Sequence, residues 1–421
     1  MSFQQGISGL TAASRNLEVI GNNIANAATY GFKNSRAEFA DVYANAMNGA
    51  GSNSIGIGVN LAAVAQQFTQ GNITTTENSM DLAINGSGFF QVSDGRNPTM
   101  YTRNGQFKID RDGYIVNNQA QKLLGYPADG QGTIQPGQAR PLQLPTAGID
   151  PRATDGIDME LNLDARSAVT LPSSGDRINF DDPTTYNNAT SVTVYDAKGQ
   201  DIALTYYFQK SATDQWNVYV TANGAPISVD GSGVPQPSTT LTFPSNGGNP
   251  TAPSGPVAID IPAGTRPGGG ATLPLDDVQL DLSSATQYGA SFGVTDLNQT
   301  GYAPGQLSGI QIESNGVVMA RYSNGQSKPA GQLELANFRN PQGLQPMGGN
   351  AWAATYGSGD PVVGAAGDGN FGVLQSGSLE ESNSDLTGEL VNMITAQRAY
   401  QANAQTIKTQ DAVLQTLVNL R

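Results

Sequence analysis

Proline divides the sequence into three parts. All 23 prolines lie between Pro98 and Pro361, so residues 1–97 and 362–421 contain none. Proline clashes with the preceding helical turn and lacks a backbone N–H, so it is rarely found inside helices. The two ends can therefore form long helices, whereas the centre favours strands and turns.

The N-terminal part predicts one amphipathic helix. Ser2 followed by Gln5 fits a capping box. Apolar residues then recur at alternating spacings of four and three, interrupted at Ser14 and Gly21. The stripe consists of Phe3, Ile7, Leu10, Leu17, Ile24 and Ala28. This spacing is typical of a helix that packs one face against a second helix.

The C-terminal part predicts a longer helix of about five heptads. Ser382 with Asp385 indicates its start, and the stripe is interrupted at Gln397 and Asp411. The stripe consists of Leu386, Leu390, Met393, Tyr400, Ala404, Ile407, Leu414 and Val418. The spacing alone leaves two arrangements open, since these helices could pack on their own chain or form a coiled coil between chains.

The central part alternates apolar and polar residues with a period of two, which predicts strands. Hairpin turns are indicated at Asp112-Gly113, Asp196-Ala197-Lys198-Gly199 and Asn315-Gly316. The proline-rich stretch 223–274 predicts long surface loops between short strands. We therefore expect an α+β, multidomain chain, with two mainly β domains inserted between terminal helices that form a coiled-coil-like domain.

Charge and composition exclude several classes of function. The net charge is −14, which argues against a nucleic acid partner. The chain contains no histidine and no cysteine, which removes the usual ligands of structural zinc and the Ser-His-Asp triad. No run approaches the ~20 apolar residues of a membrane span, so we expect no membrane insertion. The first residues lack the basic and apolar regions of a cleaved signal peptide.

Three motifs could carry chemistry, and each has a simpler interpretation. Residues 367–372 match the GxGxxG string but lack the helix that should open directly after it, so we interpret them as a turn. Residues 110–113 and the cluster Asp276, Asp277 and Asp281 lack the full calcium-binding loop. Nothing selects one carboxylate pair for a glycosidase. We expect no catalytic, cofactor-binding or metal-binding residue, no cofactor and no enzyme activity.

Both ends carry long motifs of a known family. The N-terminal motif is 16–26 followed by Thr29-Tyr30-Gly31-Phe32-Lys33, and the C-terminal motif is 377–386 followed by 393–404. With these motifs the chain resembles the axial proteins of the bacterial flagellum, which build its rod, hook and filament. Residues 85–90, 101–107 and 124–127 look like the β-domain that hook subunits share with the distal rod protein. The additional β-domain that opens at 192–196 is typical of hook subunits.

The resemblance implies a division into four parts. These are a terminal helical polymerisation domain (1–28 and 384–421), a connecting segment (29–72 and 360–383), an inner β domain (73–147 and 295–359) and an outer β domain (148–294). The ends carry similar numbers of acids and bases, whereas the centre between them carries the acidic excess. Like-charge repulsion is therefore smallest where the subunits of a polymer would pack most densely.

The resemblance also implies a function. It implies a structural subunit that polymerises into a hollow helical tube, the flagellar hook, which acts as a flexible universal joint passing torque from rod to filament in motility. The implied partners are further copies of the chain, the distal rod protein, the hook–filament junction protein, the hook cap and the flagellar type III export apparatus. The implied location is outside the cell, reached without a cleaved signal peptide. A distal rod subunit and a secreted adhesin are the alternatives.

The apolar stripes are the expected assembly interface. It consists of Ile7, Leu10, Leu17, Ile24, Leu386, Leu390, Met393, Tyr400, Ile407 and Leu414. Isolated helices of this length are marginal in water. We therefore expect both ends to be largely disordered in the free monomer and to fold on assembly. Trypsin should then cleave the monomer early at Arg15, Lys33, Arg398 and Lys408.

Overall fold

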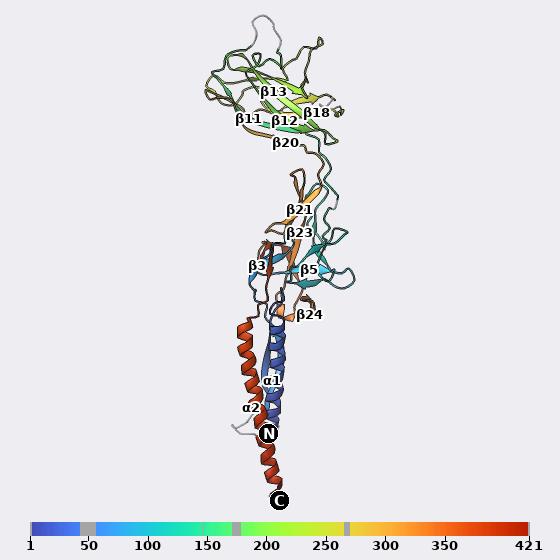
Figure 1. Cartoon of the computed structure of the whole chain (residues 1–421), viewed down its shortest axis with the longest axis vertical. Coiled ribbons are helices and arrows are strands. Elements are labelled where there is room, and N and C mark those ends of the chain that lie inside the picture. The colour runs from blue at the N-terminus through green and yellow to red at the C-terminus, as the bar shows by residue number, and fades with distance from the viewer. Residues whose placement is uncertain (1, 43–55, 146, 171–177, 265–269, 420–421) are drawn as a thin grey trace. The chain divides into compact units, whose positions relative to one another are not determined.

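The computed structural model describes residues 2–42, 56–145, 147–170, 178–264 and 270–419 (Figure 1). Side chains are described from Gln4 to Thr416 within these ranges. The chain forms two compact units. The first unit contains Met1–Thr146, Ser308–Arg321 and Ser327–Arg421, and the second contains Ala147–Leu307 and Tyr322–Gln326.

Two helices from opposite ends of the chain lie side by side in the first unit (Figure 1). They are α1 (Ser2–Ala25) and α2 (Leu386–Asn419). Asp385 begins α2, because its Oδ1 accepts the N–H of Thr387 at 3.0 Å and its carbonyl accepts the N–H of Glu389 at 2.8 Å. The expected start at Ser382 is wrong, since its Oγ accepts the N–H of Ser384 in the preceding turn. The predicted Ser2 cap and the stripe residues Phe3 and Val418 lie outside the described side chains.

A two-stranded hairpin packs along α1. It consists of β1 (Ser35–Val42) and β2 (Gly58–Gln66), which are antiparallel with Ser35 opposite Gln66. Isolated two-stranded hairpins are marginal in water. The contact with α1 is therefore part of what stabilises this hairpin.

A twelve-stranded sheet forms most of the β part of the first unit. Its main path runs β21-β22-β23-β9-β5-β6-β25-β24. Its strands are β5 (Phe89–Ser93), β6 (Met100–Thr102), β7 (Lys108–Ile109), β8 (Ile115–Val116), β9 (Lys122–Pro127), β10 (Arg140–Pro141), β21 (Leu307–Ile312), β22 (Val317–Tyr322), β23 (Ser327–Asn337), β24 (Gln345–Gly348), β25 (Ala351–Ala353) and β26 (Val362–Ala365). A short 3₁₀ helix, η1 (Pro341–Gly343), precedes β24. The core of this part includes Phe90, Leu123 and Leu333, which are fully buried.

Two short strand pairs bring the N-terminal and C-terminal segments of the first unit together. β3 (Ile73–Thr75) pairs with β28 (Ser378–Glu380), and β4 (Leu82–Asn85) pairs with β27 (Val373–Ser376). Both pairs are antiparallel. The chain therefore leaves the β part next to where it entered, which places the starts of β1 and α2 close together.

The second unit contains two five-stranded sheets that share one hydrophobic core. The first sheet contains β11 (Gly156–Asp164), β17 (Val257–Ile261), β18 (Leu275–Asp281), β19 (Thr286–Tyr288) and β20 (Gly293–Gln299). The second contains β12 (Asn188–Tyr195), β13 (Asp201–Ala212), β14 (Gln215–Ala222), β15 (Ala225–Pro226) and β16 (Thr239–Thr242). Alternate residues of β11 and β13 point into the core, as expected for two packed sheets.

Four turns share the sequence pattern Asp-x-x-Gly, at Asp110, Asp129, Asp196 and Asp230. In each turn the aspartate Oδ1 accepts the N–H groups of the second and fourth residues that follow. Hydrogen bonds from the backbone of Thr133 and Gln131 hold the pKa of Asp129 below its usual value. Several of the central aspartates thus sit in turns.

The predicted fold class and the three hairpins are confirmed. The hairpin turns join β7 to β8, β12 to β13 and β21 to β22. The GxGxxG string forms a turn between β26 and β27, with no helix after it. The carboxylate of Asp277 accepts a hydrogen bond from the side chain of Gln279, and that of Asp281 accepts one from the backbone of Ser283. No helix in the described ranges is long and apolar enough to cross a bilayer.

One buried carboxylate, that of Glu334 on β23, is held by two side chains. The hydroxyl of Tyr126 donates to its Oε1 at 2.6 Å, and the amide of Gln91 donates to its Oε2 at 2.7 Å. Burial, together with the hydrogen bond to Glu334, raises the pKa of Tyr126 to about 12.

The raised pKa of Tyr126 predicts a loss of stability at alkaline pH. Below pH 10 this tyrosine is neutral in both states, so its contribution is complete. Between about pH 10 and pH 12 the unfolded chain loses the proton first, so the free energy of unfolding falls. Denaturant unfolding at pH 9 and pH 11.5 should show a smaller loss for Tyr126→Phe than for the parent protein. Tyr356→Phe, at an exposed position, is the control; equal losses in all three proteins would contradict the assignment.

Candidate assembly surface and buried junction

A buried carboxylate lies where the helices of the first unit meet its β part. Glu380, the last residue of β28, has a fully buried side chain. Its Oε1 lies 2.5 Å from Nζ of Lys33, and its Oε2 lies 3.2 Å from a guanidinium nitrogen of Arg103. The N–H of Gly71 also donates to Oε1 at 2.9 Å. We call Lys33, Arg103 and Glu380 the buried junction.

The two cations of the buried junction share one carboxylate, and backbone carbonyls supply further acceptors, although Nε of Arg103 has none. Lys33 donates to the carbonyl of Thr69 at 2.7 Å, and Arg103 donates to the carbonyl of Gly86 at 2.9 Å. Burial lowers the pKa of Lys33, and the nearby Glu380 acts in the opposite direction. Burial also lowers the pKa of Arg103, and Glu380 again acts in the opposite direction. Buried charges are tolerated when they are paired and hydrogen-bonded in this way.

The backbone around the buried junction is equally close-packed. The N–H of Gly31 donates to the carbonyl of Glu380 at 2.8 Å. Gly31 has φ = 70°, and a Cβ there would lie 2.5 Å from the backbone nitrogen of Asn104. Only glycine combines this conformation with so close an approach.

Asparagine side chains connect the helices to the buried junction. The amide of Asn23 on α1 donates to the carbonyl of Ser35 at 2.8 Å and to Glu389 on α2 at 3.0 Å. The N–H of Ser35 donates back to Asn23 at 2.9 Å. Asn383 accepts the N–H of Asn34 at 2.7 Å and donates to the carbonyl of Gln67 at 2.7 Å. These bonds orient α1, α2 and β1 relative to one another.

Small residues form the contact between α1 and α2. A Cβ on Gly6 would lie 3.0 Å from the side chain of Ile407, and one on Gly9 would lie 2.9 Å from Asn403. Ala13 and Ile20 on α1 and Ala396 on α2 are also buried. Helix α1 can therefore approach α2 closely at Gly6 and Gly9, where it carries no side chain.

Half of the ten expected interface residues are exposed within the chain. Met393 and Ile407 are half-buried, and Ile407 faces Gly6. Leu10, Leu17 and Ile24 are half-buried. The others are exposed, among them Leu390 at 45% and Leu414 at 52%; the exposed members are Ile7, Leu386, Leu390, Tyr400 and Leu414. Within one chain, the residues buried between the two helices thus lie mostly one position before those of the predicted apolar stripe.

Three further apolar side chains belong to the exposed surface of α2. They are Val391, Ile394 and Val413, which the heptad spacing did not include. We call the exposed apolar residues of the two helices, Ile7, Leu386, Leu390, Val391, Ile394, Tyr400, Val413 and Leu414, the outer helical face. Several exposed large apolar side chains gathered on one pair of helices indicate an interaction site.

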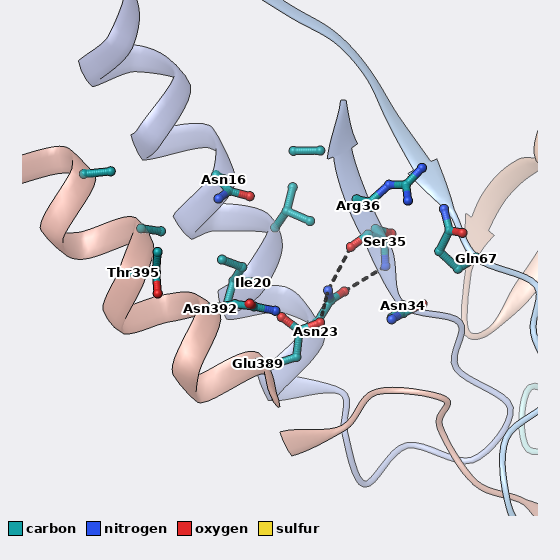
Figure 2. A pocket seen from close by; sticks show the side chains of 14 residues that line it. Asn16, Ile20, Asn23, Asn34, Ser35, Arg36, Gln67, Glu389, Asn392 and Thr395 are labelled. Carbon is teal, nitrogen blue, oxygen red and sulfur yellow. Dashed lines mark hydrogen bonds between the residues drawn. The ribbon is translucent and has the colours of Figure 1, made fainter. Parts of the chain in front are cut away.

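A pocket of about 580 Å³ lies between α1, α2 and the start of β1 (Figure 2). Its lining is mixed, with amides and charged side chains beside small apolar ones. The lining includes Asn16, Val19, Ile20, Asn34, Arg36, Gln67, Asn392, Thr395, Ala396 and Ala399. In the parts of the chain that the structure describes, no group of acidic residues has the arrangement of a metal site. The chemistry present is therefore that of packing and hydrogen bonding.

Sequence analysis missed the buried junction. Lys33 and Glu380 lie within the quoted terminal motifs and Arg103 lies in the interior motif 101–107, but spacing gives no sign that they meet. The available signal was a charged residue next to Phe32 and another next to Leu379. Such positions are unusual because charged side chains are rarely buried without a partner.

The terminal segments match two family models. Residues 3–33 match "Flagella basal body rod protein", and residues 375–420 match "Flagellar basal body rod FlgEFG protein C-terminal". Residues 83–200 match "Flagellar hook protein FlgE/F/G D1 domain", and residues 162–302 match "Flagellar basal body protein FlaE D2 domain". Helical ends with these β-domains between them define the class of flagellar rod and hook proteins.

Whole-chain comparisons narrow this class. The chain is 44% identical to "Flagellar hook protein FlgE" of Salmonella typhimurium over 423 residues, covering 100% of both chains. It is 43% identical to the Escherichia coli protein of that name over 425 residues, again covering 100% of both. The chain therefore belongs to the flagellar hook protein FlgE family. The crystal structure of Helicobacter pylori flagellar hook protein FlgE2 has a similar fold, with a TM-score of 0.53, 16% identity, and coverage of 73% of this chain and 100% of that one.

Replacing the shared carboxylate should destabilise the first unit. Glu380→Gln leaves Lys33 and Arg103 buried without a counter-charge, which should cost about 3–5 kcal/mol of unfolding free energy. Denaturant unfolding followed by circular dichroism measures this loss. The matched control is Glu381→Gln, because Glu381 is the next residue and is only half-buried. Similar losses in the two variants would show that the buried junction has no special role.

Proposed function

We propose that this chain is the subunit of the flagellar hook, and that it polymerises into a hollow helical tube that passes torque from rod to filament as a flexible joint. The observation that carries the proposal is the outer helical face, which nothing in the described part of the chain covers. Membership of the hook family makes further copies of the chain the natural cover. The ten expected interface residues remain the proposed contacts.

Open polymers need contacts that do not close on themselves. When one surface of a subunit binds a different surface of the next, the array grows without limit. The outer helical face suits such contacts, because burying apolar side chains stabilises association in proportion to the area removed from water. Residues 1–72 and 386–421 carry few charges of either sign, so dense packing there meets little repulsion.

The proposal includes the four-part division stated from the sequence. The helical parts, 1–28 and 384–421, form the inner wall, and 29–72 with 360–383 connect it to the β-domains. The inner β domain comprises 73–147 and 295–359, and the outer one comprises 148–294. The outer domains would touch weakly enough to slide while the helices stay paired, which makes the tube flexible.

The proposed partners follow from a place between rod and filament. They are the distal rod protein, the hook–filament junction protein, the hook cap and the type III export apparatus. We place the protein outside the cell, exported unfolded without a cleaved signal peptide. The absence of cysteine supports this route, since no thiol can cross-link the chain in an oxidising exterior. We assign it a structural role with no enzyme activity, no nucleic acid partner and no membrane insertion.

A hook subunit is favoured over the two alternatives. Similarity to hook proteins extends over the full length, including the additional β-domain at 162–302. A secreted adhesin would not need terminal helices with rod-family motifs. The distal rod is tested directly by the experiment below.

Electron microscopy of basal bodies tests the function. A strain without the gene should have rods that end without a hook, and the parent gene should restore hooks. Leu390→Asp should not restore them, because assembly would bury an unpaired carboxylate at a cost of several kcal/mol; Ile24→Asp should behave alike. Gln236→Asp is the control, an exposed polar position in the proline-rich stretch 223–274, away from the helices. Normal hooks from Leu390→Asp would refute the interface, and rods truncated below the hook would assign the protein to the distal rod.

Limited proteolysis tests the folding of the ends on assembly. In dilute monomer, trypsin should cut early at Arg15, Arg398 and Lys408, and polymer should be protected there. The structure argues against early cleavage at Lys33, contrary to the sequence expectation, because its ammonium is buried against Glu380. Lys33 therefore serves as the internal reference. Protection of Arg15 and Arg398 in dilute monomer would contradict disordered ends.

A further inference from the structure

Tyr356 is displayed completely to solvent. It lies in the loop between β25 and β26, and its relative exposure is 105%. An aromatic side chain with no cover loses the favourable burial that such residues usually obtain. Tyrosine is also among the residues that most often carry the binding energy of protein interfaces.

The turn that carries Tyr356 is rigid. The hydroxyl of Thr355 donates to the carbonyl of Gly343 at 2.5 Å, and the amide of Asn340 donates to the carbonyl of Gly357 at 2.9 Å. Ser358 is buried, and its hydroxyl accepts the N–H of Thr355 at 3.0 Å. A side chain held on a fixed turn loses little conformational entropy when it binds.

The pocket of Figure 2 has a polar atom without a partner. Among the described residues, Oδ1 of Asn34 is buried without a donor. A buried acceptor without a donor costs free energy, so an entering hydroxyl would be favourable. The small apolar residues Val19, Ile20, Ala396 and Ala399 offer surface for a ring.

Hydrogen bonds connect the segment before the Tyr356 turn to residues next to those that line the pocket. The indole N–H of Trp352 on β25 donates to Oε1 of Gln66 at 2.6 Å, next to Gln67 of the pocket. The amide of Asn350 donates to the carbonyl of Tyr30 at 2.9 Å. Subunits arranged around a tube axis meet their neighbours at equal distances from that axis. The Tyr356 turn of one subunit and the pocket of the next can therefore meet if they lie at the same distance from the axis.

We propose that the ring of Tyr356 from one copy enters the pocket of a second copy. The ring would pack on the apolar lining, and its hydroxyl would donate to Oδ1 of Asn34. The occupant is a second copy because Tyr356 is fully exposed within its own chain, so it does not fill its own pocket. A protruding residue and a receiving pocket on different surfaces make a heterologous contact, which is the kind an open helical polymer requires. This inference rests on the proposed self-assembly.

The first test measures the critical concentration for polymerisation of the purified full chain. Tyr356→Ala should raise it about tenfold, as expected for loss of an anchoring tyrosine. Tyr356→Phe keeps the ring and should raise it less. Tyr288→Ala, another exposed tyrosine, is the control and should change it little. An unchanged critical concentration for Tyr356→Ala would overturn the proposal.

The second test identifies the neighbour. Position 356 is replaced by p-benzoylphenylalanine, and the assembled polymer is irradiated. Trypsin should release an adduct with the peptide 16–33, which contains Asn16, Val19 and Ile20 of the pocket, or with pocket residues 389–399. Dilute monomer should give no adduct. Adducts confined to other residues, the same adduct in monomer, or no adduct in well-formed polymer would each overturn the proposal.

These outcomes separate the two proposals. If the parent protein forms no polymer, both the proposed function and the proposed contact are wrong. If polymers form normally with Tyr356→Ala and the adducts lie elsewhere, the hook function stands and only the contact is wrong.

Discussion

The first unit depends on one carboxylate that is shared by two cations. Glu380 holds Lys33 and Arg103 in the same buried site, although the three residues come from distant parts of the chain. A buried ion pair adds little net stability, because desolvation offsets the attraction between the charges. The ion pair instead selects one arrangement of the three segments, because any other pairing would leave a charge buried without a partner. The strand pairs β3–β28 and β4–β27 and the asparagine bonds around Asn23 and Asn383 all follow from that arrangement.

Local patterns predicted the elements well. Helices at both ends followed from the absence of proline and the apolar spacing, and the hairpins followed from turn sequences such as Asn315-Gly316. The contact between the helices was harder to predict. A search for apolar spacing finds large apolar residues. This contact instead uses Gly6, Gly9 and Ala13, whose small size lets the two helices approach closely. The buried junction could not be predicted from spacing, since its partners lie far apart in the sequence.

The two faces of the helices have different roles. The small inner face pairs α1 with α2 within one chain, and the outer helical face keeps its large apolar side chains exposed. Interruptions of the predicted stripe at Ser14, Gly21 and Gln397 lie one position after the buried residues Ala13, Ile20 and Ala396. The acidic centre has its own explanation, because several of its aspartates close Asp-x-x-Gly turns. These four carboxylates contribute to turn geometry.

The close contact at Gly6 and Gly9 also determines how the helical pair responds to load. Where side chains separate two helices, rotamer changes allow the gap to widen or narrow by small amounts. Here the backbone of α1 at Gly6 and Gly9 lies directly against Ile407 and Asn403, so only the side chains of α2 separate the two helices. Closely packed atoms resist compression. The pair should therefore act as one stiff rod when the structure bends, and the strain must be taken up where side chains, rather than backbone, form the contact.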